Sequence, residues 1–157
     1  MWYCPPMAAL ASASSSLWRG IGRLNHIALA VPDLGAAVAM WRDVMGGDVS
    51  APQPLPEHGV TAVFITLPNT KLELLHPLGE SSLIAPFLKR NPAGGMHHVC
   101  LEVDCLSVAI GTLEERGMRV LPPGPNTGAH GNQVAFLHPN SCGGVLLELE
   151  EAEPAAA

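Results

Sequence analysis

The sequence predicts an α+β fold built from two tandem β-α-β-β-β modules, and three observations support this. First, the stretch Asn25–Leu34 is repeated as His97–Leu106, and in both copies a histidine opens an apolar strand. Second, each copy is followed by an apolar run with one acid inside it, at Glu73 and at Glu148. Third, the predicted elements follow the same order in both halves. Such self-similarity constrains the fold more strongly than any single element does.

The first module is predicted to span residues 23–90. Pro32 ends its opening strand, and Asp33 can cap the helix that follows, because an aspartate oxygen accepts hydrogen bonds from the first turn. A Gly-Gly pair ends the helical spacing of apolar residues. The predicted elements are a strand at 24–31, a helix at 34–45, a proline-rich loop at 51–56, strands at 60–67 and 71–75, and a short helix at 82–89.

The second module is predicted to span residues 95–151. Gly117 closes its helix, and clusters of proline, glycine and asparagine separate the later strands. The predicted elements are a strand at 98–103, a helix at 106–113, a short strand at 118–121, a loop at 122–131, and strands at 134–138 and 145–150.

The two ends of the chain differ from these modules. Residues 1–22 are rich in alanine and serine and hold no acid, which is typical of a mitochondrial transit peptide. A plain disordered leader or a secretory peptide is the alternative, because residues 1–22 contain a single arginine. We predict a disordered tail at 152–157.

Composition excludes several kinds of protein. The 157 residues provide enough chain for one core, and a hydrophobic fraction of 48% is typical of a globular protein. The formal net charge of −6 argues against nucleic-acid binding, because phosphate contacts require a basic surface. No apolar stretch approaches the ~18 residues that a bilayer crossing needs, so we expect no membrane insertion.

Strand alternation predicts which way the repeated polar residues point. His26 shares a strand face with two alanines, while the bulkier apolar residues share the face that a helix would cover. His98 takes the equivalent face in the second copy. Glu73 and Glu148 lie among leucines, where an unpaired carboxylate is costly. The alternatives are edge strands with acids in water and histidines that are structural.

Two imidazoles and two carboxylates, contributed in pairs by the two halves, predict a metal site. The predicted ligands are His26, His98, Glu73 and Glu148. Without a thiolate, this set suits Co²⁺, Mn²⁺, Ni²⁺, Fe²⁺ or Zn²⁺. Four protein ligands in an octahedron leave two positions open, which is enough for a substrate that chelates through two oxygens.

Several motifs in residues 22–150 resemble a known family. They are Leu24–Ala28, Pro54–Val60, Lys71–Gly79, Gly94–His98, Gly128–Gly131, Phe136–Pro139 and Cys142–Leu149. Together these motifs resemble the vicinal oxygen chelate superfamily and, within it, the methylmalonyl-CoA epimerases. The resemblance implies cupped mixed β-sheets around a metal, most often Co²⁺, held by His26, His98, Glu148 and Glu73. It also implies an acyl-CoA substrate, a homodimer and a place in the mitochondrial matrix.

The activity that the resemblance implies is interconversion of (2R)- and (2S)-methylmalonyl-CoA in propionyl-CoA catabolism. A proton α to the thioester leaves from one face of the carbon and returns to the other. Glu148 and Glu73 are the candidate bases by symmetry. Some bacterial epimerases place a second glutamate where this chain has Ala62, so the second base stays open. Candidate anchors for the CoA phosphates, by charge alone, are Lys71, Lys89 and Arg90.

Other activities on the same scaffold are the alternatives. A glyoxalase-like isomerase or an extradiol dioxygenase could use the same metal ligands. A non-catalytic small-molecule binder does not need both histidines and both glutamates together, so their joint presence counts against it.

Overall fold

The computed structural model describes residues 19–152. Residues 1–18 of the predicted leader and residues 153–157 of the predicted tail lie outside this range. Backbone contacts divide the chain into two compact units. One unit runs from His26 to His98, and the other combines the described residues before His26 with those after His98.

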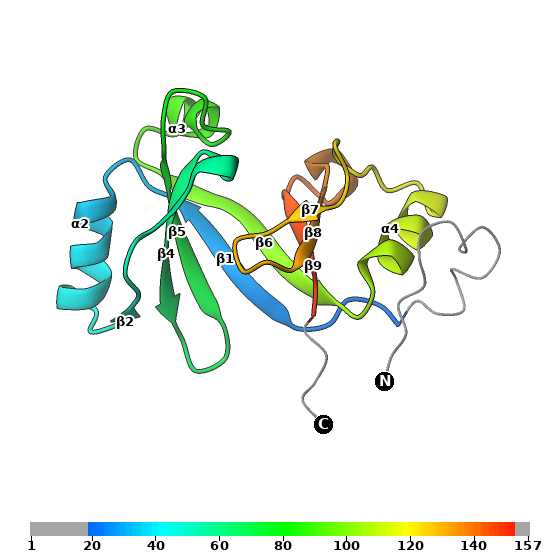
Figure 1. Cartoon of the computed structure of the whole chain (residues 1–157), viewed down its shortest axis with the longest axis horizontal. Coiled ribbons are helices and arrows are strands. Elements are labelled where there is room, and N and C mark those ends of the chain that lie inside the picture. Colours follow the sequence, from blue (N-terminus) through cyan, green and yellow to red (C-terminus); the bar gives the residue numbers. More distant parts are fainter. Residues whose placement is uncertain (1–18, 153–157) are drawn as a thin grey trace. The chain divides into compact units, whose positions relative to one another are not determined.

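The unit His26–His98 is built on a mixed sheet with the strand order β2-β4-β5-β1, to which β3 is added by pairing with β4. Strands β1 and β5 are parallel, and β5 and β4 are antiparallel (Figure 1). The strands are β1 (Leu24–Ala30), β2 (Asp48–Val49), β3 (Gln53–Leu55), β4 (Val60–Thr66) and β5 (Lys71–Pro77).

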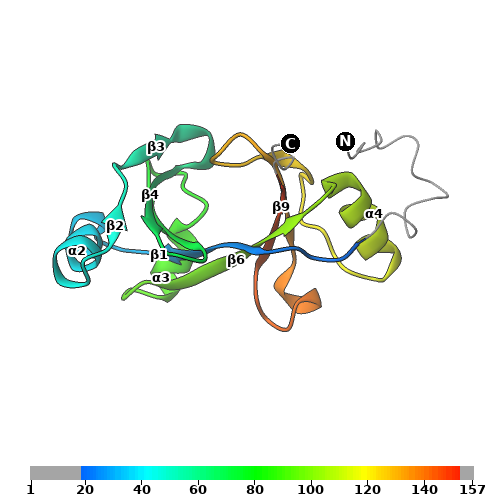
Figure 2. The ribbon, with the colours of Figure 1, turned by 90° about the horizontal axis from the view of Figure 1, so that it is seen from below.

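One face of this sheet is covered by α2 (Leu34–Ala39), which continues as the π-helical turn η2 (Met40–Val44). Asp33 caps the helix as predicted, since its Oδ1 accepts a hydrogen bond from the Ala36 N–H at 2.9 Å. The buried centre is formed by Val63, Ile65 and Leu74, and apolar residues of α2 pack against it. Figures 1 and 2 show α2 beside β2 and β4. The opposite face of the sheet carries His26 and Glu73 among buried apolar residues.

Two predictions for this unit need correction. The span 51–56 is not all loop, because Gln53–Leu55 forms β3. Proline lacks a backbone N–H and so is tolerated at the margin of a sheet, where β3 lies beside β4. The predicted single helix at 34–45 instead changes from α to π geometry at Met40. The turn η3 (Pro56–His58) joins β3 to β4, and α3 (Ala85–Arg90) lies between β5 and β6, close to the predicted helix at 82–89.

The other unit repeats this design with the strand order β6-β9-β8-β7. Strands β6 and β9 are parallel, and β9 and β8 are antiparallel. Helix α4 packs on one face through Leu106, Ala109 and Ile110, against Ala135 and Leu149. The elements are β6 (Gly95–Val103), α4 (Leu106–Glu115), β7 (Asn126–Thr127), β8 (Gln133–Leu137), η4 (Pro139–Ser141) and β9 (Leu147–Glu151).

Here too the structure corrects two predictions. Residues 118–121 do not form a strand and contribute only an isolated bridge between Val120 and Leu137. The predicted loop at 122–131 contains β7, which pairs with β8. Among residues 19–152, no helix has the length and apolar character that a membrane crossing requires.

The repeat predicted from the sequence holds at the level of register. In the first unit Glu73 is paired with Ala28 on β1 and with Phe64 on β4. In the second, Glu148 is paired with Cys100 on β6 and with Phe136 on β8. Ala28 and Cys100 each follow the repeated histidine by two positions. The predicted α+β class of two repeated modules is therefore confirmed.

Candidate metal centre

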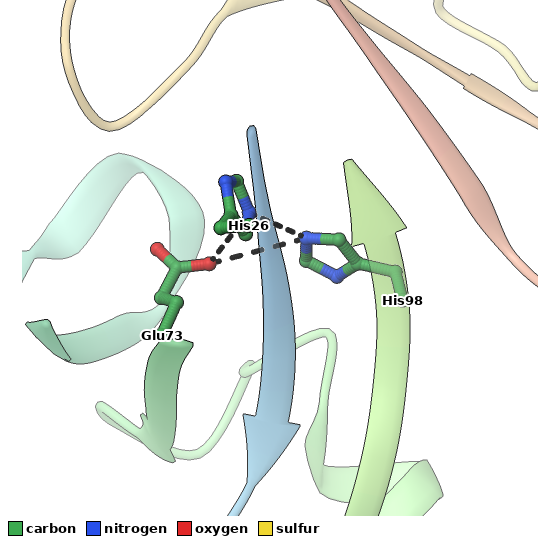
Figure 3. A group of neighbouring side chains, drawn as sticks. All are labelled: His26, Glu73 and His98. Carbon is green, nitrogen blue, oxygen red and sulfur yellow. Dashed lines mark hydrogen bonds and ion pairs between the residues drawn. The ribbon is translucent and has the colours of Figure 1, made fainter. Parts of the chain in front are cut away.

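Three predicted ligands meet in the unit His26–His98, on the face of the sheet opposite α2. His26 Nε2 lies 3.2 Å from Glu73 Oε2 and 3.3 Å from His98 Nε2. His98 Nε2 lies 3.9 Å from the same Glu73 oxygen. Figure 3 shows the two rings and the carboxylate pointing toward one another from three strands. Within this unit, the structure thus brings together the predicted ligands His26, Glu73 and His98.

Register and alternation account for this convergence. Because β1 and β5 are parallel, His26 is paired with Lys71 and Ala28 with Glu73, so His26 and Glu73 are diagonal neighbours on one face. His26, Ala28 and Ala30 are all buried on that face, as the alternation predicts. Ala28 and Ala30 contribute only methyl groups to that face.

A glycine turn at Gly94 precedes β6. Gly94 has a left-handed φ of +82°, and a Cβ on Gly94 would lie 2.5 Å from the Ala30 carbonyl oxygen. Only glycine therefore fits between this turn and β1. The turn delivers the chain into β6, where His98 is the fourth residue. A backbone constraint near β1 thus helps to place a ligand on β6.

Burial makes this cluster costly unless its charges are compensated. His26 is 3% exposed, Glu73 4% and His98 5%. A carboxylate removed from water to this degree needs a counter-charge or strong hydrogen bonds. The three separations leave a point about 2 Å from all three ligand atoms, which is the length of Zn–N and Zn–O bonds. The residues present therefore fit a divalent ion.

The chemistry of the donors narrows the choice of ion. Two imidazole nitrogens and one carboxylate oxygen suit a divalent transition metal better than Ca²⁺ or Mg²⁺, which favour oxygen-only sites. This donor set also leaves coordination positions for further ligands. The geometry is consistent with a Lewis-acid centre that can bind a substrate oxygen.

The fourth predicted ligand, Glu148, lies in the other unit. Its side chain is buried, with 7% exposure, in the middle of β9. Its strand partners, Cys100 and Phe136, correspond to the partners of Glu73 by repeat. Glu148 thus occupies the repeat-equivalent position to Glu73, inside its own sheet.

Two further side chains stand out near the three ligands. The Lys71 ammonium lies 5.5 Å from the centre of the Phe64 ring, and Phe64 is the strand partner of Glu73. Lys71 shares the strand face of Glu73 because it lies two residues away on β5. His97 Nδ1 lies 2.9 Å from His98 Nδ1. The sequence marked Lys71 only by its charge, and alternation assigned His97 to the opposite face from His98.

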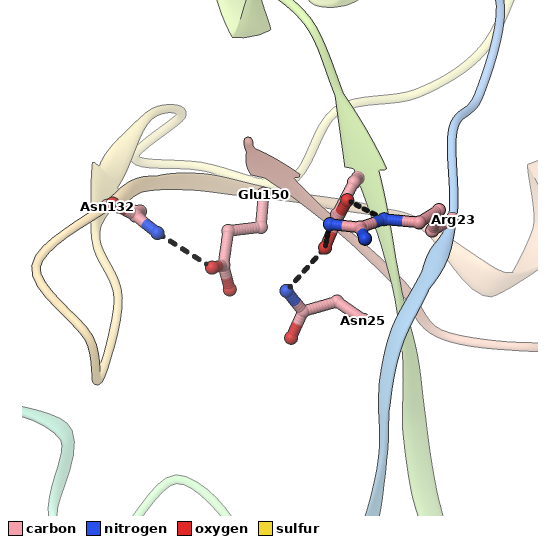
Figure 4. A network of polar contacts seen from close by, with 5 residues as sticks. Arg23, Asn25, Asn132 and Glu150 are labelled. Carbon is pink, nitrogen blue, oxygen red and sulfur yellow. Dashed lines mark hydrogen bonds and ion pairs between the residues drawn. The ribbon is translucent and has the colours of Figure 1, made fainter. Parts of the chain in front are cut away.

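A second polar network lies in the other unit (Figure 4). Glu150 is 5% exposed, and its Oε1 accepts a hydrogen bond of 2.9 Å from the Asn132 amide. Glu102 accepts hydrogen bonds from Arg23 at 3.0 Å and from Asn25 at 3.2 Å. We did not predict Glu150. The signal that could have found it is a second acid two residues after Glu148, on the same strand face.

Comparison with known proteins extends these observations. Residues 25–136 match the Glyoxalase/Bleomycin resistance protein/Dioxygenase superfamily. The chain is 60% identical over 132 residues to "Methylmalonyl-CoA epimerase, mitochondrial" from Bos taurus, covering 84% of this chain and 75% of that protein. It is 61% identical over 132 residues to "Ethylmalonyl-CoA/methylmalonyl-CoA epimerase" from Cereibacter sphaeroides, covering 83% and 98%.

Solved structures agree with the sequence relatives. Methylmalonyl-CoA epimerase from Mycobacterium tuberculosis superimposes with a TM-score of 0.78 at 29% identity, covering 85% of this chain and 90% of that one. A methylmalonyl-CoA epimerase in complex with methylmalonyl-CoA and NH4+ gives a TM-score of 0.77 at 31% identity, covering 83% and 94%. The chain therefore belongs to the methylmalonyl-CoA epimerase family, within the Glyoxalase/Bleomycin resistance protein/Dioxygenase superfamily.

Proposed function

We propose that this chain interconverts (2R)- and (2S)-methylmalonyl-CoA, as an isomerase of propionyl-CoA catabolism. The observation that carries the proposal is the convergence of His26, Glu73 and His98 on one point about 2 Å from each ligand atom. High identity to proteins named methylmalonyl-CoA epimerase supports the choice of substrate.

The proposed metal ligands are His26, His98 and Glu73, joined by Glu148 from the other unit. The support for Glu148 is its repeat-equivalent register, its burial and the family resemblance. When bound, the cation supplies Lewis-acid polarisation of the thioester oxygen, which stabilises the enolate charge. We expect Co²⁺ as the physiological ion, with Mn²⁺, Ni²⁺ or Zn²⁺ as substitutes.

Proton transfer at the α-carbon falls to the two glutamates in this proposal. Inversion requires a group on each side of a planar enolate, and Glu73 and Glu148 are related by the internal repeat. One carboxylate would take the proton from its face of the α-carbon, and the other, in its protonated form, would deliver a proton to the opposite face. Ala62 cannot contribute, since its side chain is a buried methyl group opposite Leu75 on β5.

Binding of the CoA portion would depend on cations near the sheet. Lys71 lies on the same strand face as Glu73 and is the strand partner of His26. Lys89 and Arg90 lie exposed in the last turn of α3. We propose all three side chains as contacts for the CoA phosphates.

We further propose that the protein acts as a homodimer in the mitochondrial matrix, with residues 1–22 as its transit peptide. Relatives from Bos taurus and Mus musculus that carry the word mitochondrial in their names support the location. Import of the labelled full-length chain into isolated mitochondria, followed by sequencing of the mature N-terminus, tests it. A chain that stays outside the organelle at full length contradicts it.

The deciding experiment for the activity uses each pure epimer in D₂O. Metal-stripped protein is reloaded with Co²⁺ and incubated with (2R)- or (2S)-methylmalonyl-CoA, and deuterium at C2 is followed by mass spectrometry. We expect deuterium incorporation and interconversion from either epimer, and neither in the stripped protein. A Glu148→Gln variant that keeps its metal and full exchange would contradict the base role of Glu148.

The same preparation tests the alternatives. Oxygen uptake with a catechol and Fe²⁺ would indicate an extradiol dioxygenase, and turnover of a hemithioacetal would indicate a glyoxalase-like isomerase. Tight binding of a small molecule without any turnover would indicate a binding protein. Because one relative is named for ethylmalonyl-CoA as well, that substrate is included to define the tolerance for a longer C2 substituent.

A further inference from the structure

His97 contacts a predicted metal ligand although it was expected to face away from it. The two nitrogens of the His98 ring have separate surroundings. Its Nε2 faces His26 and Glu73, and its Nδ1 lies 2.9 Å from His97 Nδ1. A separation of 2.9 Å between two ring nitrogens is hydrogen-bonding distance. One of the two nitrogens must therefore donate.

The proposed ligand role of His98 decides which nitrogen donates. His98 Nε2 faces the cluster, 3.3 Å from His26 Nε2 and 3.9 Å from Glu73 Oε2. A nitrogen that binds a cation presents a lone pair to it, so His98 Nε2 carries no hydrogen in the proposed centre. A neutral imidazole has one N–H, which in His98 is then on Nδ1.

We infer that His97 is a positioning residue that fixes the tautomer and orientation of His98. His97 Nδ1 accepts the hydrogen from His98 Nδ1, and its own hydrogen is on Nε2. This leaves the His98 Nε2 lone pair directed at the cluster, as a metal ligand requires. Ligating histidines are commonly held by a hydrogen bond to their second nitrogen, and here another imidazole provides it.

The His97 ring is itself held in place. It meets the Phe87 ring from α3 edge to face, with centroids 5.2 Å apart and an interplanar angle of 74°. Helix α3 thereby packs against β6 through an aromatic contact. The contacts from Phe87 to His97 and from His97 to His98 therefore link the packing of α3 to the direction of the His98 lone pair.

The test reads the tautomer before any activity is measured. The full chain is labelled with ¹⁵N-histidine, and long-range ¹H–¹⁵N spectra are recorded without metal and with Zn²⁺, well above the ordinary imidazole pKa of about 6.5. We expect His98 in the Nδ1–H form in both spectra. A hydrogen on His98 Nε2 in the metal-free protein would overturn the inference.

Two substitutions separate the hydrogen bond from packing. His97→Asn keeps an acceptor oxygen close to the place of Nδ1, and His97→Leu removes it. Competition with a chelating dye should show Zn²⁺ affinity reduced about 10–100-fold in His97→Leu and largely restored in His97→Asn. His58→Leu, which removes a histidine outside the cluster, should bind as the parent does. Equal Zn²⁺ affinity in the parent and His97→Leu would count against the inference.

The inference rests on the proposed metal centre, but the two can fail separately. If no epimerisation occurs while the tautomer and the His97 effect on Zn²⁺ affinity are observed, the proposed function fails and the role of His97 stands. If epimerisation occurs and His97→Leu has parental Zn²⁺ affinity, the role of His97 fails alone. Circular dichroism of each variant confirms folding, and His97→Asn keeps the comparison available if His97→Leu does not fold.

Discussion

Gly94 lies so close to Ala30 that a Cβ added to it would be 2.5 Å from the Ala30 carbonyl oxygen. Its φ of +82° is also in the left-handed region. Gly94→Ala should therefore lower the free energy of unfolding by more than the ~1–2 kcal/mol that left-handed strain alone costs. Urea denaturation measures this. Gly46→Ala is the control, because its φ is +69° but no atom lies within 4 Å of the added Cβ. Equal losses would mean that the Ala30 contact is unimportant.

Metal removal should lower thermal stability. A ligand that binds only the folded state stabilises it by ~2.7 kcal/mol at 100 times its Kd, which corresponds to roughly 5–11 °C in Tm for a protein of this size. Thermal unfolding by circular dichroism, with Co²⁺ and after chelation, measures the shift. His26→Ala removes a ligand, and its Tm should not respond to Co²⁺. A full response in His26→Ala would show that the ion binds elsewhere.

Glu73→Gln separates metal binding from proton transfer. The amide oxygen can still ligate, but a neutral amide cannot act as a base at neutral pH. We expect Co²⁺ affinity within about tenfold of the parent, while deuterium exchange at C2 falls by ~10²–10⁴, the usual contribution of a general base. Isothermal titration and the exchange assay provide the two readouts. Unchanged exchange would leave Glu73 as a ligand alone.

The apolar centre under α2 should be sensitive to truncation. Leu74 is fully buried on β5, on the opposite face from Glu73. Leu74→Ala should cost about 2–5 kcal/mol of unfolding free energy, because it removes buried surface and leaves a cavity. Leu83 is 82% exposed, so Leu83→Ala should change stability by less than about 0.5 kcal/mol. Similar losses in the two variants would contradict the assignment of this core.

Asn132 should stabilise its unit through Glu150. Its amide donates to a carboxylate oxygen that is almost completely buried. Asn132→Ala removes that donor and should cost about 1–3 kcal/mol. Arg23→Ala is the comparison, since the Arg23 side chain is 85% exposed and its pair with Glu102 should contribute under about 1 kcal/mol. A larger loss in Arg23→Ala would reverse this ranking.

Much of the fold could be predicted because it is repeated. Alternation along β1 correctly separated His26 from Leu29 and Val31, which pack toward α2. The Asp33 cap was also predictable, because the interaction is local. The strand β3 was missed because proline normally interrupts a sheet, and only pairing with β4 makes Pro54 acceptable.

The site was less predictable in its details. Residue type and repeat position were enough to select His26, Glu73 and His98. The contact between His97 and His98 was not predicted, because alternation fixes the direction of each Cα–Cβ bond but not the rotation of the ring beyond it. The burial of Glu150 depends on β8 and β9 packing together, which no local pattern encodes.

His26 and His98 are separated by 72 positions in the chain. A cation bound by both histidines would link two positions that are separated by almost half of the polypeptide, as a disulfide can. In the chain-entropy description a disulfide across a loop of that length restrains the unfolded chain by roughly 4 kcal/mol, whereas a cation that leaves on unfolding stabilises the protein through its own binding free energy. A chelator would remove this link, whereas breaking a disulfide requires a reductant. The supply of cation would therefore control this part of the protein's stability.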